Sequence, residues 1–128
     1  MHLTIVCDIQ YNGIEVKILS DFKETAANLS QELRRGTIVL SVLSQLKTPK
    51  YGYALVEQLE QQGIRVEPGT LYPLLRRLEK QELLTSEWET SGSKPRKYYV
   101  MSATGKLVFE LLCDEWEDIS KSIALLMK

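Results

Sequence analysis

The sequence predicts a mainly α-helical fold with a small β-wing and a long C-terminal helix. Three observations predict it. Leucines recur at helical spacing in residues 67–80. Residues 84–89 and 97–101 then read as two strands around a Ser/Gly-rich, basic tip, which is typical of a hairpin. Residues 102–127 finally carry apolar residues three and four apart. A helix followed directly by a basic hairpin indicates a winged helix-turn-helix, here followed by a dimerisation helix.

Two helices are predicted ahead of the leucine-rich one. Asn28 is a suitable N-cap for the first helix, which is broadly apolar up to Leu46. Tyr51 begins the second helix, and Gly63 supplies its C-terminal stop. The apolar surface of the first helix is wide enough to be buried on more than one side. Together with the leucine-rich helix and the hairpin, these two helices make up the expected winged DNA-binding domain, residues 28–101.

Residues 1–27 form an N-terminal extension with a different pattern. Apolar and polar residues alternate on both sides of Asn12-Gly13. An Asn-Gly pair between two alternating segments is the strongest short-range hairpin signal. We expect a β-hairpin over residues 3–20. Because an isolated two-stranded hairpin is marginal in water, either it docks on something, or the segment is partly ordered or lies outside the natural domain.

The leucine-rich helix begins near Pro68, where a proline suits the first turn. Its leucines at positions i, i+3, i+4 and i+7 must face the core: Leu71, Leu74, Leu75 and Leu78. By exclusion the positions that point outward are Gly69, Tyr72, Pro73, Arg76 and Lys80, and those on the flanks are Thr70 and Arg77. Tyr72 has a second interpretation as a core aromatic, but the leucines already fill the inward face. We expect it to point outward.

A charged helix face is often only solvated, so Arg76 alone indicates little. The hairpin that follows favours DNA binding over a merely solvated face, because it carries Lys94, Arg96 and Lys97 near its tip. A helix sized for the major groove beside a cationic hairpin predicts one element that reads bases and one that holds phosphates. We expect DNA contacts from both.

The C-terminal helix, residues 102–128, begins at Ser102, a good N-cap. Its apolar seam is close to a heptad pattern and too long for the winged core to cover, so it predicts a homodimer. The expected interface residues are Val108, Leu112, Trp116, Ile119 and Ile123. Trp116 has two interpretations, which are compatible: a dimer anchor, or an aromatic wall for a planar hydrophobic effector.

Composition excludes several other functions. The 128-residue chain has a net charge of −1, but residues 30–100 hold 11 Lys and Arg against 8 Asp and Glu, which places positive charge around the helix and wing. No apolar run approaches the ~20 residues that span a bilayer. His2 is the only histidine, and Cys7 and Cys113 lie far apart. We expect a cytosolic, cytoplasmic protein with reduced cysteines, no catalytic or metal site and no cofactor.

Several segments resemble the PadR family of bacterial transcriptional regulators. GTLYPLLRRLEKQELL, residues 69–84, looks like the family's recognition helix, and YGYALVEQLEQ, residues 51–61, like the helix before it. KPRKYYVMSATG, residues 94–105, is similar to the wing and the following cap, and ELRRGTIVLSVLSQL, residues 32–46, to the opening helix. The resemblance covers about residues 28–128, so residues 1–27 lie outside it. The single C-terminal helix is similar to the small subfamily.

The resemblance implies a homodimeric regulator, usually a repressor, that binds a pseudo-palindromic double-stranded operator. It also implies release by a small hydrophobic or phenolic effector. The family's outward tyrosine falls on Tyr72 and its first-turn tyrosine of the preceding helix on Tyr51, a candidate phosphate contact. The ligand-sandwiching tryptophan falls on Trp116. Two alternatives remain open from the residues: a winged module that pairs with another protein, and a ligand-binding protein without DNA contacts.

Overall fold

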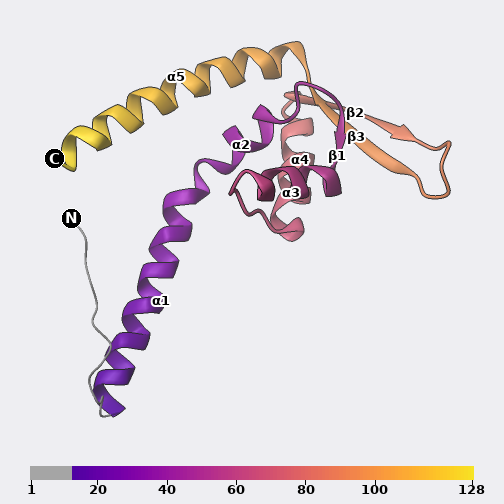
Figure 1. Cartoon of the computed structure of the whole chain (residues 1–128). Coiled ribbons are helices and arrows are strands. Elements are labelled where there is room, and N and C mark those ends of the chain that lie inside the picture. Colours follow the sequence, from indigo (N-terminus) through magenta and orange to yellow (C-terminus); the bar gives the residue numbers. More distant parts are fainter. Residues whose placement is uncertain (1–12) are drawn as a thin grey trace. The chain divides into compact units, whose positions relative to one another are not determined.

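The computed structural model describes residues 13–128 of the chain (Figure 1). Two compact units emerge, with the boundary between Arg35 and Gly36. The described part of the first unit is one helix, and the second unit contains the remaining helices and the sheet. The fold class is mainly helical with a small antiparallel sheet, as the sequence predicts.

The first unit corrects the predicted N-terminal hairpin. Helix α1, Gly13–Arg35, is 23 residues long, so the predicted second strand is helical. The predicted first strand, with Cys7, lies outside the described residues. Asn28 lies within α1 and does not cap a helix. The physical reason is that a helical repeat of apolar residues outweighs a short alternating stretch: Leu19, Phe22, Ala26, Leu29 and Leu33 are spaced three and four apart.

The predicted opening helix is also interrupted. A turn at Gly36 and Thr37 separates α1 from α2, Ile38–Ser44. The apolar side chains of α1 are largely exposed, with Leu29 at 59% and Leu33 at 75%. In contrast, α2 is buried at Val42 and Leu43. Only the second half of the predicted helix therefore belongs to the winged core.

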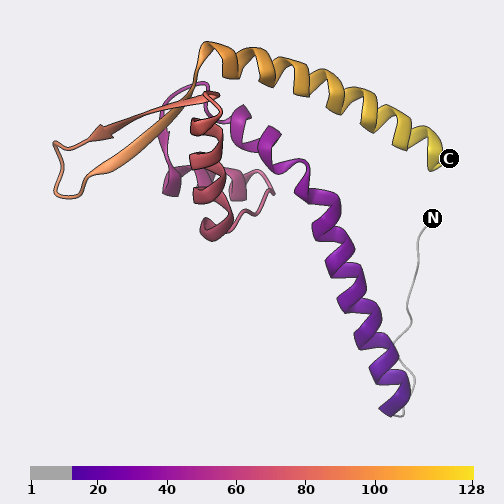
Figure 2. The ribbon, with the colours of Figure 1, turned by 180° about the vertical axis from the view of Figure 1, so that it is seen from behind.

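The second unit has the element order of a winged helix. After α2 come β1, Lys50–Tyr51, and α3, Gly52–Gln61, followed by α4, Pro68–Lys80. The wing is β2, Leu84–Glu89, and β3, Arg96–Met101. The strand order is β1-β3-β2, with both pairs antiparallel. Figure 2 shows the β2–β3 hairpin extending away from α3 and α4.

A leucine-rich core fixes the orientation of α4. Its members are Val42, Leu43, Leu46, Leu55, Leu59, Val66, Leu71, Leu74, Leu75, Leu78, Leu84, Tyr99 and Met101. All four leucines of α4 that were predicted to face inward are buried. Burying one leucine contributes about 1.5–3 kcal/mol, so this ridge strongly determines which face of α4 remains outside.

The last helix, α5, Ala103–Leu126, is fixed at its start to the turn before the wing. The Ser102 hydroxyl accepts a hydrogen bond from the Gly105 N–H at 2.9 Å and donates one to the Glu82 carbonyl at 2.7 Å. The predicted N-cap at Ser102 is thus confirmed. Phe109 and Leu112 pack against the core, and the helix is largely exposed beyond them.

Candidate nucleic-acid interface

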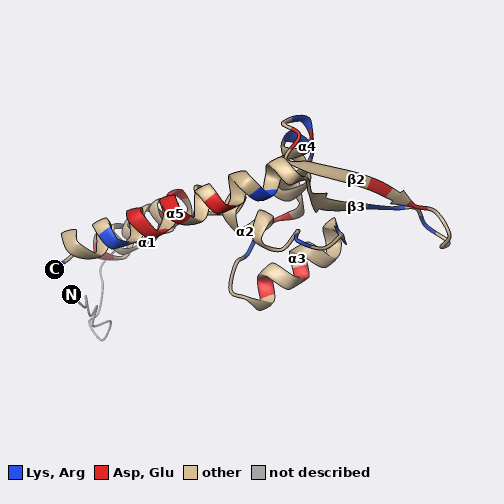
Figure 3. Ribbon diagram, turned by 90° about the horizontal axis from the view of Figure 1, so that it is seen from above, with Lys and Arg blue, Asp and Glu red and all other residues tan. Residues whose placement is uncertain are grey.

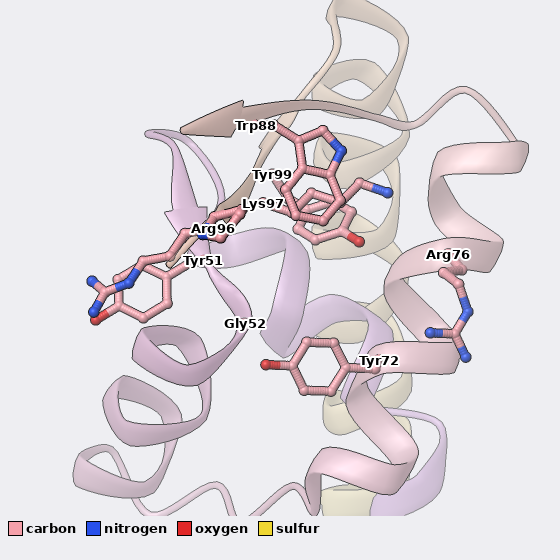
Figure 4. Close-up of a pocket in the computed structure, with 9 residues that line it drawn as sticks. Tyr51, Gly52, Tyr72, Arg76, Trp88, Arg96, Lys97 and Tyr99 are labelled. Carbon is pink, nitrogen blue, oxygen red and sulfur yellow. The ribbon is translucent and has the colours of Figure 1, made fainter. Parts of the chain in front are cut away.

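A hollow of about 420 Å³ lies between α4 and the wing. It is open to solvent and combines aromatic with cationic side chains (Figure 4). Its lining residues are Tyr51, Gly52, Tyr72, Arg76, Trp88, Pro95, Arg96, Lys97 and Tyr99. Most of the predicted DNA contacts therefore meet at one surface, although they come from different elements of the second unit.

Tyr72 lies on the outward face of α4, with 38% of its surface exposed. Its ring points toward the start of α3, where Gly52 is buried (Figure 4). A Cβ atom placed on Gly52 would lie 2.5 Å from Tyr72 Cε1 and 2.7 Å from its Oη. Only glycine permits this close approach, so α3 orients the Tyr72 ring. The expectation that Tyr72 points outward is met, and the hydroxyl end of the ring is supported by Gly52.

The first turn of α4 is exposed at Gly69 and Thr70. A Cβ atom on Gly69 would meet nothing within 4 Å, so the protein itself does not require a glycine there. Arg76, one turn beyond Tyr72, is also exposed. In the described part of the chain its guanidinium forms no ion pair with a carboxylate. The outward face of α4 is thus sterically open and positively charged.

Tyr51 is contacted by two side chains of the wing. The Arg96 guanidinium lies over its ring at 4.6 Å from the centroid, and Tyr98 meets the ring edge-on at 5.6 Å. Tyr51 and Tyr98 are also partners in the β1–β3 register. A cation over an aromatic face contributes about 0.5–1 kcal/mol at an exposed position. The stack therefore positions Arg96 and the Tyr51 hydroxyl together.

Lys97 differs from the other wing cations because it already has a carboxylate partner. Its Nζ lies 3.1 Å from Glu79 Oε1, and the second carboxylate oxygen of Glu79 accepts a hydrogen bond from Ser86. The Ser86 hydroxyl, and then Lys97, hold the pKa of Glu79 below its ordinary value. The hydrogen bond to Glu79 in turn raises the pKa of Lys97. We call Glu79, Ser86 and Lys97 the wing latch, since they join α4 to both wing strands.

The wing tip is exposed and basic. Lys94 lies in the loop between β2 and β3 and forms no ion pair among the described residues. At the other side of this loop, Glu89 accepts a hydrogen bond from the Ser91 N–H at 2.8 Å and another from its hydroxyl. These hydrogen bonds lower the pKa of Glu89, the one from the hydroxyl most strongly. Figure 3 shows basic residues on the wing and α4, and acidic residues along α5.

Sequence reasoning missed Trp88, which lines the same hollow. It lies on β2 opposite Lys97 and is 63% exposed. A signal was present: Trp88 has the same strand parity as Leu84 and Ser86, so it continues the core face of β2 beyond the core. Sequence reasoning also missed the latch, because Glu79 and Lys97 are 18 residues apart and meet only when the wing packs beside α4.

The predicted dimer residues divide into two groups along α5. Val108 and Leu112 are half-buried, and Leu112 packs against its own core. Trp116, Ile119 and Ile123 are 46%, 48% and 43% exposed. The second group therefore forms an apolar strip that the winged core leaves uncovered.

Within residues 13–128 no cluster of three or more His, Cys, Asp or Glu side chains is placed to hold a metal ion. No helix in that range is long and apolar enough to cross a membrane. Cys113 is a free, half-buried thiol on α5.

The fold and this surface define a winged helix-turn-helix protein of the transcription-regulator class. A sequence model of the Transcriptional regulator PadR-like family matches residues 39–111, more than half of the chain. The chain belongs to this family of DNA-binding regulators and is not an enzyme. The resemblance in the recognition helix, wing and cap is thereby confirmed.

Solved structures and a curated relative agree with this family assignment. A PadR family transcriptional regulator from Eggerthella lenta is 46% identical, with a TM-score of 0.81 over 85% of this chain and 97% of that one. A PadR-like transcription factor from Bacteroides fragilis is 31% identical, with a TM-score of 0.65 over 77% and 98%. The transcriptional regulator Rv3488 of Mycobacterium tuberculosis is 35% identical over 77 residues, 59% of this chain and 72% of that protein.

Proposed function

We propose that the protein is a homodimeric transcriptional repressor that binds a pseudo-palindromic operator through α4 and the wing. One observation carries the proposal: the outward face of α4, with Tyr72 and Arg76, opens on the same hollow as the cations of the wing. A positively charged aromatic surface between a helix and a hairpin matches a groove edge and its phosphate backbone.

In this proposal α4 enters the major groove. Gly69 and Thr70 approach the bases first because they lie in the exposed N-terminal turn, and Tyr72 and Arg76 follow one and two turns later. Gly69 suits a close approach because it lacks a side chain that would hold DNA away from the helix backbone.

The wing supplies phosphate contacts that carry no sequence information. Lys94 at the tip and Arg96 above Tyr51 are the candidates, since neither has a carboxylate partner in the described structure. Lys97 is expected to act mainly through the wing latch. Phosphate contacts of this kind fix the register of the helix in the groove.

Dimerisation is proposed through the exposed strip of α5, which begins at Trp116 and continues through Ile119 and Ile123. At about 1.5 Å per residue the 24 residues of α5 extend roughly 36 Å, much of it beyond the core. Apolar residues at near-heptad spacing along such a helix fit a second copy of the same helix. Paired helices would then hold the two α4 helices about one DNA turn apart, roughly 34 Å.

A small hydrophobic or phenolic effector is proposed to bind beside Trp116. The exposed indole at the start of the strip supports it, because a ligand between two paired helices would change the angle between the winged units. A coupling of about 1–3 kcal/mol is enough to change operator occupancy noticeably.

The test begins with selection of genomic fragments bound by the purified protein. Fluorescence anisotropy then compares the recovered site with a random duplex at two salt concentrations, and light scattering gives the mass. Tyr72→Ala should weaken binding to the selected site more than to the random duplex. Failure to bind either duplex at low salt would favour a protein–protein interaction module or a ligand-binding protein. A monomer at working concentration would exclude the proposed arrangement.

A further inference from the structure

We infer that the hollow between α4 and the wing seats one backbone phosphate of the DNA, with Trp88 packed against its deoxyribose. This inference rests on the proposed function and adds a contact that neither the sequence motifs nor the family assignment names. The wing would then contact the DNA through the cations near its tip and through the ring of Trp88, in the next-to-last strand pair before the tip.

The position of Trp88 is the first observation. A single exposed aromatic is ordinary on a protein surface, so exposure alone indicates nothing. Trp88, however, belongs to the strand face that continues the core through Leu84 and Ser86, and it pairs with Lys97 across the wing. Figure 4 shows its indole above the space between the wing and Tyr72. The ring therefore forms the upper wall of the hollow rather than an isolated surface group.

The chemistry of the hollow is the second observation. None of the described residues that line it is acidic, whereas Arg76, Arg96 and Lys97 are cationic. The charge of Lys97 is shared with Glu79, which leaves two guanidinium groups without carboxylate partners in the described chain. A site with net positive charge and aromatic walls fits one anionic group flanked by apolar atoms. A phosphodiester between two deoxyriboses has this composition.

Size and location agree with that occupant. Pockets of about 300–1,000 Å³ bury drug-sized ligands, and the hollow, at about 420 Å³, is open enough for one sugar-phosphate unit that continues in both directions. It lies between the helix proposed for the groove and the hairpin proposed for the phosphates. A backbone strand at the groove edge would have to pass there.

This packing predicts a distinctive binding phenotype. Trp88→Ala removes apolar packing but no charge, so affinity should fall about tenfold, the equivalent of roughly 60 Å² of buried apolar surface. The decrease should be the same for the selected site and for a random duplex. The salt dependence should stay unchanged, because the number of phosphate charges neutralised does not change.

A direct readout uses the wild-type sequence, which contains two tryptophans. Protein labelled with 5-fluorotryptophan gives one fluorine resonance each for Trp88 and Trp116, and Trp88→Phe assigns them. Addition of a duplex should move the Trp88 resonance and reduce its shift between H₂O and D₂O. Circular dichroism and thermal unfolding of Trp88→Ala check that the substitution has not altered the fold.

The outcomes separate the two proposals. If wild-type protein binds DNA normally but the Trp88 resonance keeps its solvent sensitivity, or Trp88→Ala binds like wild type, the inference is overturned and the proposed function stands. If 4-hydroxybenzoate protects Trp88 and DNA does not, the hollow is a small-ligand site and the inference is again overturned. If wild-type protein binds no duplex, the proposed function fails, and the inference with it.

Discussion

Substituting Gly52 with alanine tests whether α3 controls DNA recognition by orienting Tyr72. The new Cβ would lie 2.5 Å from Tyr72 Cε1, whereas carbon atoms pack at about 3.5–4.0 Å. The ring must therefore move by roughly 1 Å. Tyr72 is only partly covered, so it can rotate outward at a cost of about 0.5–1.5 kcal/mol. Alanine also favours helix over glycine, by up to about 1 kcal/mol in a helix interior and by less at the first position of α3, which offsets part of that cost.

The expected result is a protein of nearly unchanged stability with impaired recognition. A good base contact contributes about 1–3 kcal/mol of discrimination, so displacement of Tyr72 should weaken binding to the selected operator roughly 5- to 150-fold. Binding to a random duplex should change much less. Fluorescence anisotropy measures both affinities, and thermal unfolding measures stability. Gly36→Ala is the matched control, because a Cβ there meets nothing within 4 Å.

A double-mutant cycle gives the decisive comparison. If Gly52 acts only through the tyrosine, adding Gly52→Ala to Tyr72→Ala should cause no further decrease in affinity. Additive decreases would mean that Gly52 acts by another route, such as close approach of the α3 backbone to a phosphate. Wild-type operator affinity in Gly52→Ala would refute the claim that the supported orientation of Tyr72 matters.

Three further substitutions and one control variant test the wing and α5. Lys94→Ala should weaken binding to all duplexes and flatten the slope of log K against log salt by about 0.9 for each phosphate that is no longer neutralised. The control Lys121→Ala removes the same charge from α5 and should leave this slope unaltered. Glu79→Gln should destabilise the fold by about 0.2–1 kcal/mol at neutral pH. Because the pKa of Glu79 is lowered in the folded state, this stabilisation is fully present above about pH 4.3, the ordinary glutamate pKa. The difference in stability between wild type and Glu79→Gln should vanish as the pH falls through the folded-state pKa of Glu79. Because the pKa of Lys97 is raised in the folded state, the stabilisation by the Glu79–Lys97 pair persists up to about pH 10. Ile119→Asp should give a folded monomer by light scattering; a dimer would argue against α5 as the interface.

The winged unit was predictable because its signals agree with one another. The leucine spacing of α4, the proline at its start and the cap at Ser102 are local features that the tertiary structure keeps. They also determined that Tyr72 and Arg76 face outward. The hairpin prediction failed for the opposite reason. Asn12-Gly13 and a few alternating residues are a short signal, and the helical repeat that follows in α1 extends over more residues.

The contacts that shape the site were beyond sequence reasoning because they join elements far apart in the chain. Arg96 over Tyr51 depends on the pairing of β3 with β1, and the latch depends on where the wing crosses α4. A list of wing cations treats Arg96 and Lys97 alike, although they face opposite sides of β3. Strand parity was the one available clue, and it also indicated Trp88.

The number of phosphates that the cations neutralise can be measured from the salt dependence of DNA binding. Net charge of −1 is compatible with DNA binding because screening over about 8–10 Å makes the local charge decisive. With one phosphate in the hollow, shared by Arg76 and Arg96, and one at Lys94 in each subunit of the proposed dimer, the salt slope should be about −3.6. If Lys97 left Glu79 to bind a third phosphate, the slope should approach about −5.4. A slope near about −5.4 in wild type that Glu79→Gln does not change would show that the latch opens on DNA, whereas a slope near about −3.6 would show that Lys97 holds the wing in place throughout.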